Sequence, residues 1–143
     1  MQLTYLPLML AGMATAIPSA AKVNTISPEV IWSVSNFTIG CSQGGCIFEY
    51  DIAGRGNNET PPFRTHCTGA EKKEVYCNDK NITTTVSPAG NPVWNVDVTH
   101  RWSTWLDPQS LAIWYQQGAK NVTVPDHKPV KFVMKPTEEY GVA

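Results

Sequence analysis

The sequence predicts an all-β domain, a compact antiparallel β-barrel or β-sandwich with two local disulfides. Several windows alternate apolar and polar residues with period two and are bounded by Gly, Pro, Asn and Asp. No window sustains the i, i+3, i+4, i+7 apolar spacing of an amphipathic helix. The four cysteines of the 143-residue chain form two close pairs, Cys41/Cys46 and Cys67/Cys77. Together these features favour short strands joined by clamped turns.

The chain begins with an apolar segment typical of a secretion signal. Residues 3–16 carry no charged side chain and are too few to span a membrane. Ala14-Thr15-Ala16 is a small-residue cleavage site, so we expect residues 1–16 to be a signal peptide, with an alternative cleavage after residue 21. Residues 17–143 are then expected to form a single β domain that is secreted and extracellular.

Nine strands are expected along this domain. They cover residues 30–39, 47–52, 63–68, 75–77, 82–86, 93–102, 111–116, 121–124 and 130–134. The clearest is 93–102, which places one apolar face toward a core and a polar face toward solvent. The core face comprises Trp94, Val96, Val98, His100 and Trp102. The acidic residues 137–143 are predicted to be a short flexible tail.

Turn residues separate these strands. The loop from Gly54 to Pro62, the segment 87–92, Asp107-Pro108 and the segment 125–129 each combine proline with glycine, asparagine or aspartate. Such segments cannot continue a hydrogen-bonded ladder. Many short strands at this spacing indicate a closed barrel or a sandwich.

Four cysteines allow three pairings. We predict the local one, Cys41 with Cys46 and Cys67 with Cys77, because each pair spans a connection between successive strands. Chain entropy does not choose it, since the short loops stabilise by about 2 and about 3 kcal/mol and crossed pairs would give somewhat more. A zinc site is the alternative, but the C-x4-C and C-x9-C spacings are poor for zinc. We expect no metal and no cofactor.

Charge and sequons narrow the function classes. The net charge is −1, and the absence of a basic patch argues against a nucleic-acid partner. No later segment is apolar enough for membrane insertion, and we expect a monomer or weak dimer. Four N-x-[ST] sequons indicate a secreted glycoprotein. Their asparagines are Asn36, Asn58, Asn81 and Asn121.

Several polar residues could carry hydrolytic chemistry. Glu49 and Asp51 share a strand face roughly 7 Å apart, a separation that glycoside hydrolysis can use. Arg64 and His66 share another face, and with Glu49 they could form the base, acid and phosphate clamp of a small secreted ribonuclease. A metal site built from the three histidines, His66, His100 and His127, would need a fold that brings them together. More often such residues simply solvate a strand face.

Five tryptophans are many for this length, and most should lie in the core. Trp105 lies at the edge of a strand next to a turn, and Trp114 alternates with Ile113 and Tyr115, so one of Trp105 and Trp114 should face solvent. An exposed aromatic strip could stack on sugar rings or anchor a protein partner.

Three segments resemble a known family. They are Ile31-Trp32-Ser33-Val34 with Phe37, the hairpin from Cys41 to Cys46 followed by Ile47-Phe48, and the stretch from Cys67 to Tyr76-Cys77. This pattern is similar to fungal small secreted proteins of the hypersensitive-response-inducing elicitor type, related to the Alternaria major allergen-like (AltA-like) family. The resemblance implies a compact antiparallel β-barrel or sandwich without known catalytic activity, perceived by plants as an elicitor or effector.

The first hypothesis is therefore a non-enzymatic, secreted elicitor or effector that binds a host plant protein or a cell-wall component. Recognition would use an exposed aromatic face around Trp105, Trp114 and Tyr115. The alternatives are a small secreted hydrolase, ribonuclease-like or glycosidase-like, using Glu49 with the Arg64/His66 pair, or a carbohydrate-binding module.

Overall fold

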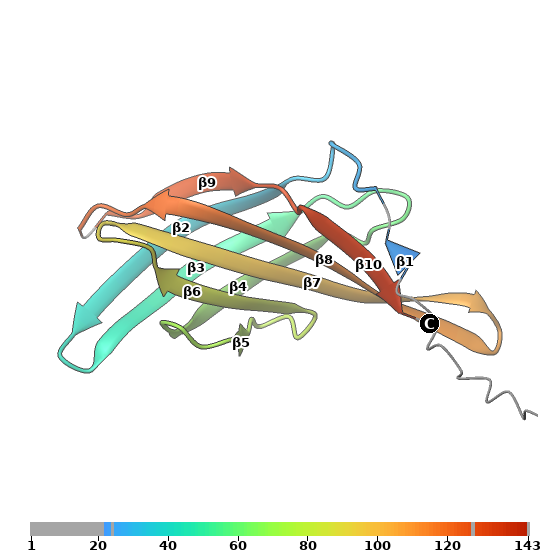
Figure 1. The fold of residues 1–143 in the computed structure, drawn as a ribbon, viewed down its shortest axis with the longest axis horizontal. Coiled ribbons are helices and arrows are strands. Elements are labelled where there is room, and N and C mark those ends of the chain that lie inside the picture. The colour runs from blue at the N-terminus through green and yellow to red at the C-terminus, as the bar shows by residue number, and fades with distance from the viewer. Residues whose placement is uncertain (1–21, 24, 127, 143) are drawn as a thin grey trace, which may run out of the picture.

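Ten antiparallel strands form two sheets in the part of the chain that the computed structural model describes, residues 22–23, 25–126 and 128–142. The six-stranded sheet has the order β1-β10-β8-β7-β6-β5, and the four-stranded sheet has the order β4-β3-β2-β9 (Figure 1). The strands are β1 (Lys22–Val23), β2 (Trp32–Ser42), β3 (Gly45–Gly54), β4 (Phe63–Ala70), β5 (Val75–Tyr76), β6 (Ile82–Pro88), β7 (Val93–Asp107), β8 (Ser110–Thr123), β9 (Val130–Met134) and β10 (Glu138–Val142). The predicted signal peptide, residues 1–16 or 1–21, lies outside the described residues.

The two sheets pack face to face, which confirms the all-β prediction and identifies the architecture as a sandwich. Period-two alternation supplies the core, since each strand buries every second residue. The largest fully buried side chains from the four-stranded sheet are Trp32, Phe37, Phe48 and Tyr50. They meet Ile82, Val86, Val96 and Val98 of the six-stranded sheet. Among the described residues, no helix has the length and apolar character that a membrane crossing requires.

A buried hydrogen-bond chain ties the two sheets together. The Tyr50 hydroxyl of β3 donates to Thr84 Oγ1 of β6 at 2.7 Å, and Thr84 Oγ1 donates in turn to the Asp97 carbonyl oxygen at 2.7 Å. Burial raises the pKa of Tyr50 well above its ordinary value, so the ring stays neutral and remains a donor. This chain satisfies polar groups that would otherwise be unpaired between the layers.

The predicted disulfide pairing is confirmed. Cys41 and Cys46 are directly opposite each other in the β2–β3 hairpin. Cys67 of β4 bonds to Cys77, which follows β5, so this second bridge joins the two sheets and is fully buried. The first bridge therefore fixes an exposed turn, and the second fastens one layer of the sandwich to the other.

One long strand, β8, replaces the two strands expected at 111–116 and 121–124. The residues between them continue the ladder with β7, where Val98 lies opposite Gly118. A Cβ at position 118 would lie 2.7 Å from the Lys135 carbonyl oxygen, so glycine is required by a close approach of backbone and not by a turn.

The C-terminal residues form a strand, which corrects the prediction of a flexible tail at 137–143. Glu138–Val142 is β10, and it pairs with β8 on one side and with β1 on the other. Its alternation is hidden in the sequence because Gly141 occupies a buried position, where a Cβ would lie 2.6 Å from the Trp114 ring. Ordering this segment extends the six-stranded sheet and adds Tyr140 to its outer face.

Candidate functional site

The β7–β8 hairpin ends in an exposed apolar tip, defined here as Trp105, Leu106 and Leu111. In Figure 1 this hairpin is the light-orange loop that extends beyond the other strands. Trp105 is 69% exposed, Leu106 60% and Leu111 41%. Trp105 lies directly opposite Leu111, and the register shift between Trp105 and Asp107 leaves Leu106 as an extra residue. The shift therefore brings three large apolar side chains to one short turn.

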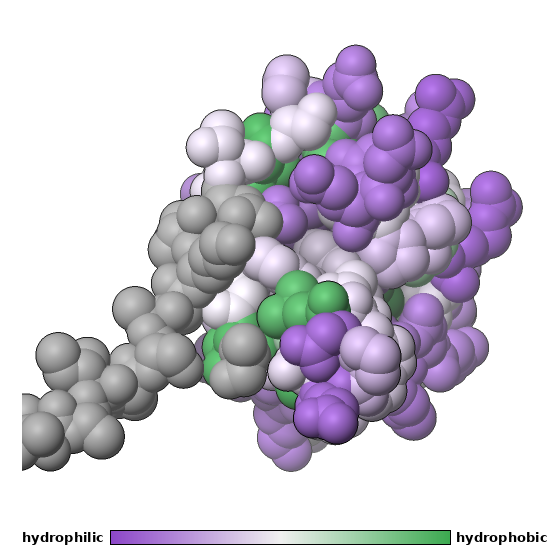
Figure 2. Space-filling model, turned by 90° about the vertical axis from the view of Figure 1, so that its right-hand side faces the viewer, coloured by the Kyte–Doolittle hydropathy of each residue, from purple (hydrophilic) through white to green (hydrophobic). Residues whose placement is uncertain are grey.

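The turn that carries this hairpin tip is fixed locally. The Gln109 backbone N–H donates to Asp107 Oδ1 at 2.8 Å, and this bond lowers the pKa of the Asp107 carboxyl. A negative charge thus lies beside the apolar side chains at physiological pH. Figure 2 views this end of the molecule and shows hydrophobic surface among hydrophilic side chains. Such a rimmed apolar patch is typical of an interaction surface.

The other predicted aromatic residues do not join the hairpin tip. Trp114 is half-buried on the inner face of its sheet, where its Nε1–H donates to Thr104 Oγ1 at 3.1 Å. Tyr115 points to the outer face and stacks on Tyr140, with the ring centroids 5.0 Å apart. Sequence reasoning expected one of Trp105 and Trp114 to face solvent, and Trp105 does, whereas Trp114 is half-buried. Of the predicted partner-binding residues, Trp105 alone is freely exposed.

A second cluster lies on the outer face of the four-stranded sheet. Asp51 of β3 and His66 of β4 are cross-strand partners, and His66 Nδ1 lies 2.8 Å from Asp51 Oδ1. His66 Nε2 lies 3.1 Å from Glu49 Oε1, and Asn36 Nδ2 donates to Asp51 Oδ2 at 3.0 Å. We call Glu49, Asp51 and His66 the acid–histidine cluster. Sequence reasoning named its members, but only the strand register brings them together.

Electrostatics favour the charged forms of Asp51 and His66. The hydrogen bond to Asp51 raises the pKa of His66, and the nearby Glu49 carboxylate acts in the same direction. The bonds from Asn36 and then His66 lower the pKa of Asp51. An imidazolium that donates from both ring nitrogens fits the geometry, so both His66 nitrogens are already engaged.

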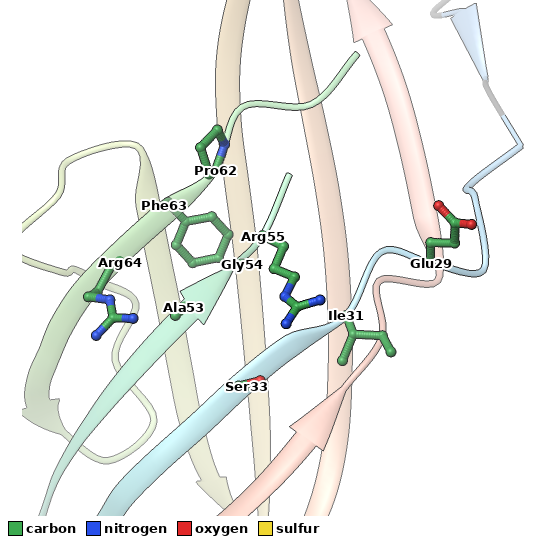
Figure 3. A pocket seen from close by; sticks show the side chains of 9 residues that line it. All are labelled: Glu29, Ile31, Ser33, Ala53, Gly54, Arg55, Pro62, Phe63 and Arg64. Carbon is green, nitrogen blue, oxygen red and sulfur yellow. The ribbon is translucent and has the colours of Figure 1, made fainter. Parts of the chain in front are cut away.

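A groove runs from this cluster along the same sheet face. One part, of about 580 Å³, is lined by Asp51, Arg64 and His66, and it shares Arg64 with a second part of about 740 Å³. Figure 3 shows the second part, where the guanidinium groups of Arg64 and Arg55 lie on either side of the Phe63 ring. The groove therefore combines cationic groups with the acid–histidine cluster and is open to solvent.

His100 does not contribute to that groove. It is 2% exposed, lies between the two sheets, and packs against Phe63 and Trp102. Burial lowers its pKa to about 4, so the ring is neutral at physiological pH. The sequence predicted a hydrogen-bonded core histidine. The core position is confirmed, but Nδ1 has no hydrogen-bond partner within the described residues.

A buried polar cluster beside His100 was not foreseen. Gln116, the cross-strand partner of His100, is fully buried, and its Nε2 donates to Thr60 Oγ1 at 3.3 Å and Glu139 Oε2 at 3.4 Å. Its Oε1 has no partner within the described part of the chain. The one hint of this cluster in the sequence was that Gln116 falls on the apolar face of a strand. Periodicity alone does not show whether such a glutamine is buried or lies at the exposed end of the strand.

All four sequon asparagines are exposed, so each is accessible to a modifying enzyme. Asn121, at the start of the expected strand 121–124, lies in β8, where its Oδ1 accepts a bond from Asn95 Nδ2. Asn36 has a positive φ of 54° at the β2 bulge, and its amide is engaged by Asp51. Asn81 lies in the turn before β6, at the edge of a groove on the other sheet.

Within residues 22–23, 25–126 and 128–142, no three His, Cys, Asp or Glu side chains are arranged to hold a metal ion. His127, one of the histidines considered from sequence, lies outside the described residues. Comparison with models of protein families, with curated proteins and with solved structures finds no match for this chain. The functional argument therefore rests on the surfaces described above.

Proposed function

We propose that this protein is a secreted, non-enzymatic recognition protein of the fungal elicitor or effector type. It binds a host plant protein or a cell-wall component through the hairpin tip. The observation that carries this proposal is the exposure of Trp105 and Leu106 on a turn that extends beyond the sandwich. The segments that resemble elicitor-type proteins support the same function, and the two disulfides are compatible with an extracellular protein.

The hairpin tip has the physical character of a binding hot spot. A tryptophan side chain buries about 150–250 Å² when it is enclosed, which corresponds to roughly 4–6 kcal/mol at about 25 cal/mol per Å². Only part of this survives as affinity, because ordering and desolvation oppose association. A loss of about 2 kcal/mol or more on truncation is typical of such an anchor.

Infiltration of the purified full-length protein into leaves tests this function. We expect necrosis or a defence response at micromolar dose with the wild type, and a much weaker one with the double variant Trp105→Ala/Leu106→Ala. Ile47→Ala is the matched control, because Ile47 is an exposed apolar residue (62%) outside the hairpin tip. Absence of any response to the wild type, or equal responses to all three proteins, would contradict the proposal.

Hydrolysis is a second candidate, favoured by the 3.1 Å contact between Glu49 and His66 beside Arg64. In a ribonuclease, Glu49 would take the proton from the attacking 2′-hydroxyl, and protonated His66 would give a proton to the leaving 5′-oxygen. Arg64 would bind the phosphate. The lowered pKa of Asp51 keeps it ionised, so it does not supply the protonated acid of a glycosidase.

Digestion of a mixed-sequence RNA by the wild type, His66→Ala and Thr68→Ala separates this candidate from the first. Thr68 is exposed and lies on β4, the strand that also carries His66, directly opposite Glu49 of β3. Thr68→Ala is therefore a matched control. Cleavage that His66→Ala abolishes and Thr68→Ala retains would support hydrolysis. If none of the three proteins cleaves RNA, or all three cleave it equally, the hydrolase candidate is excluded.

A further inference from the structure

A groove of about 480 Å³ crosses the outer face of the six-stranded sheet. It lies away from both the hairpin tip and the acid–histidine cluster, because the former is at one end of the sheet and the latter is on the other sheet. Its lining contains three tyrosines, one on β5, one on β8 and one on β10. They are Tyr76, Tyr115 and Tyr140.

Strand register builds this groove from two adjacent cross-strand rows. In one row Tyr140 lies opposite Tyr115, and Tyr115 lies opposite Arg101. In the next row Gln117 lies opposite Thr99, Thr99 opposite Thr83, and Thr83 opposite Tyr76. Because neighbouring strands are about 4.8 Å apart, the span from β5 to β8 is roughly 14 Å. The groove is thus long and shallow, with aromatic rings at both ends.

The chemistry of the lining is that of a sugar-binding surface. Tyr115 and Tyr140 are stacked with an interplanar angle of 17° and form one aromatic wall, while Tyr76 is 64% exposed at the opposite end, where Lys80 Nζ lies over its ring at 5.9 Å from the centroid. Aromatic faces pack on the C–H faces of pyranose rings, and phenol hydroxyls remain available to solvent or ligand. This combination favours a ligand that is flat, weakly apolar and rich in hydroxyl groups.

Polar groups occupy the floor between the tyrosines. Gln117 and Arg101 line the groove. The Gln117 Nε2 amide also donates to the Asp97 carboxylate at 3.3 and 3.4 Å, whereas within the described residues the Arg101 guanidinium makes no hydrogen bond or ion pair. Amide and guanidinium donors of this kind pair with sugar hydroxyls. The volume is within the range of about 300–1,000 Å³ that small-ligand sites occupy.

We infer that this tyrosine groove binds a glycan segment of neutral pyranose rings. Such a glycan could come from two sources. One is a separate polysaccharide, and the other is the chain's own N-linked glycan, because the sequon asparagine Asn81 lines the same groove and is exposed. This inference does not depend on the hairpin tip. Either hypothesis, glycan binding in the groove or partner recognition by the hairpin tip, can therefore fail without affecting the other.

Titration of full-length protein with chitohexaose, cellohexaose and laminarihexaose, followed by tyrosine fluorescence and calorimetry, tests the groove. The wild type produced in a glycosylating host is compared with Asn81→Gln. Binding by both forms assigns the groove to a separate glycan, and binding by Asn81→Gln alone assigns it to the protein's own glycan. Either result supports the inference, provided that the tyrosine variants below reduce binding.

Tyr115→Ala/Tyr140→Ala in the Asn81→Gln background should weaken binding at least tenfold. Arg101→Ala is a second variant for the case in which loss of the stacked pair prevents folding, since Arg101 is exposed and its loss opens no cavity. Ile47→Ala is the control for an exposed apolar residue on the other sheet and should leave binding unchanged. No binding by Asn81→Gln to any of the three oligosaccharides, or binding that the groove variants retain at full affinity, would overturn the inference.

Discussion

Acidification should destabilise this fold through His100. In the folded state burial lowers the pKa of His100 to about 4, against an ordinary value of 6.5, while the nearby Asp79 charge acts in the opposite direction. As the pH falls from 6.5 toward 4, His100 therefore becomes protonated in the unfolded chain but stays neutral in the folded chain. Stability is lost on acidification, and the loss is complete below the folded pKa.

The magnitude follows from the same two values. One pKa unit corresponds to about 1.36 kcal/mol, so the shift of about 2.5 units is worth about 3.4 kcal/mol at the acid limit. Between about pH 7 and about pH 5 the loss is about 2 kcal/mol. Two other groups act in the opposite direction. The raised pKa of His66 and the raised pKa of Asp97 each add stability as the pH falls.

A comparison of variants isolates the His100 contribution from those opposing groups. Urea unfolding of the wild type and His100→Phe, each at about pH 7 and about pH 5, gives four free energies of unfolding. The wild type should lose about 2 kcal/mol more than the variant over this interval. His100→Leu is the alternative if the larger ring strains the core. Parallel losses in wild type and both variants would refute the assignment of a neutral, buried His100.

Two further predictions concern the clamps between the sheets. Replacing both Cys67 and Cys77 by alanine should lower the free energy of unfolding by about 3 kcal/mol or more, because the loop-closure constraint and buried core contacts are lost together. The same change at Cys41 and Cys46 should lower it by about 2 kcal/mol. Chemical denaturation measures both losses, and equal losses or the reverse order would contradict the inter-sheet role of the Cys67–Cys77 disulfide. Tyr50→Phe should reduce the free energy of unfolding by about 1 kcal/mol through loss of the bond to Thr84, with no change in the secondary structure seen by circular dichroism; a neutral or stabilising effect would show that this bond contributes nothing.

The strands with strict alternation could be predicted from the sequence. Val93–Asp107 follows its pattern through Trp102 and beyond, and the turn at Asp107-Pro108 is where the chain reverses. The prediction ended the strand at Trp102, but Ser103 and Thr104 continue the alternation on an exposed hairpin. Pairing with β8 carries the strand past the predicted boundary.

The middle of β8 and strand β10 could not be predicted from the sequence because of their glycines and acidic residues. Gly118 and Gly141 lie where no strand was predicted, but each is required where a backbone or a tryptophan ring approaches closely. The acidic composition of Glu138-Glu139 indicated a solvated tail, yet Glu139 is buried and bonded by Gln116. Such contacts depend on partners distant in sequence, which local patterns do not contain.

The candidate sites were predicted unevenly for the same reason. Exposure of Trp105 followed from its place beside a proline turn, a local feature. Contact between Glu49 and His66 needed the β3–β4 register, and the tyrosine groove needed four strand pairings, including one with β10. Tyr76 and Tyr140 carried no sequence signal of a shared surface.

Binding of the protein to plant cell surfaces tests the hairpin tip most directly. Fluorescently labelled wild type, Trp105→Ala and Ile47→Ala would be titrated separately onto isolated leaf cell walls and onto protoplasts. A loss of about 2 kcal/mol at an interface anchor corresponds to a roughly 30-fold weaker Kd for Trp105→Ala, with Ile47→Ala equal to the wild type. Saturable wild-type binding that Trp105→Ala retains at full affinity, or no saturable binding to either preparation, would contradict recognition through the hairpin tip.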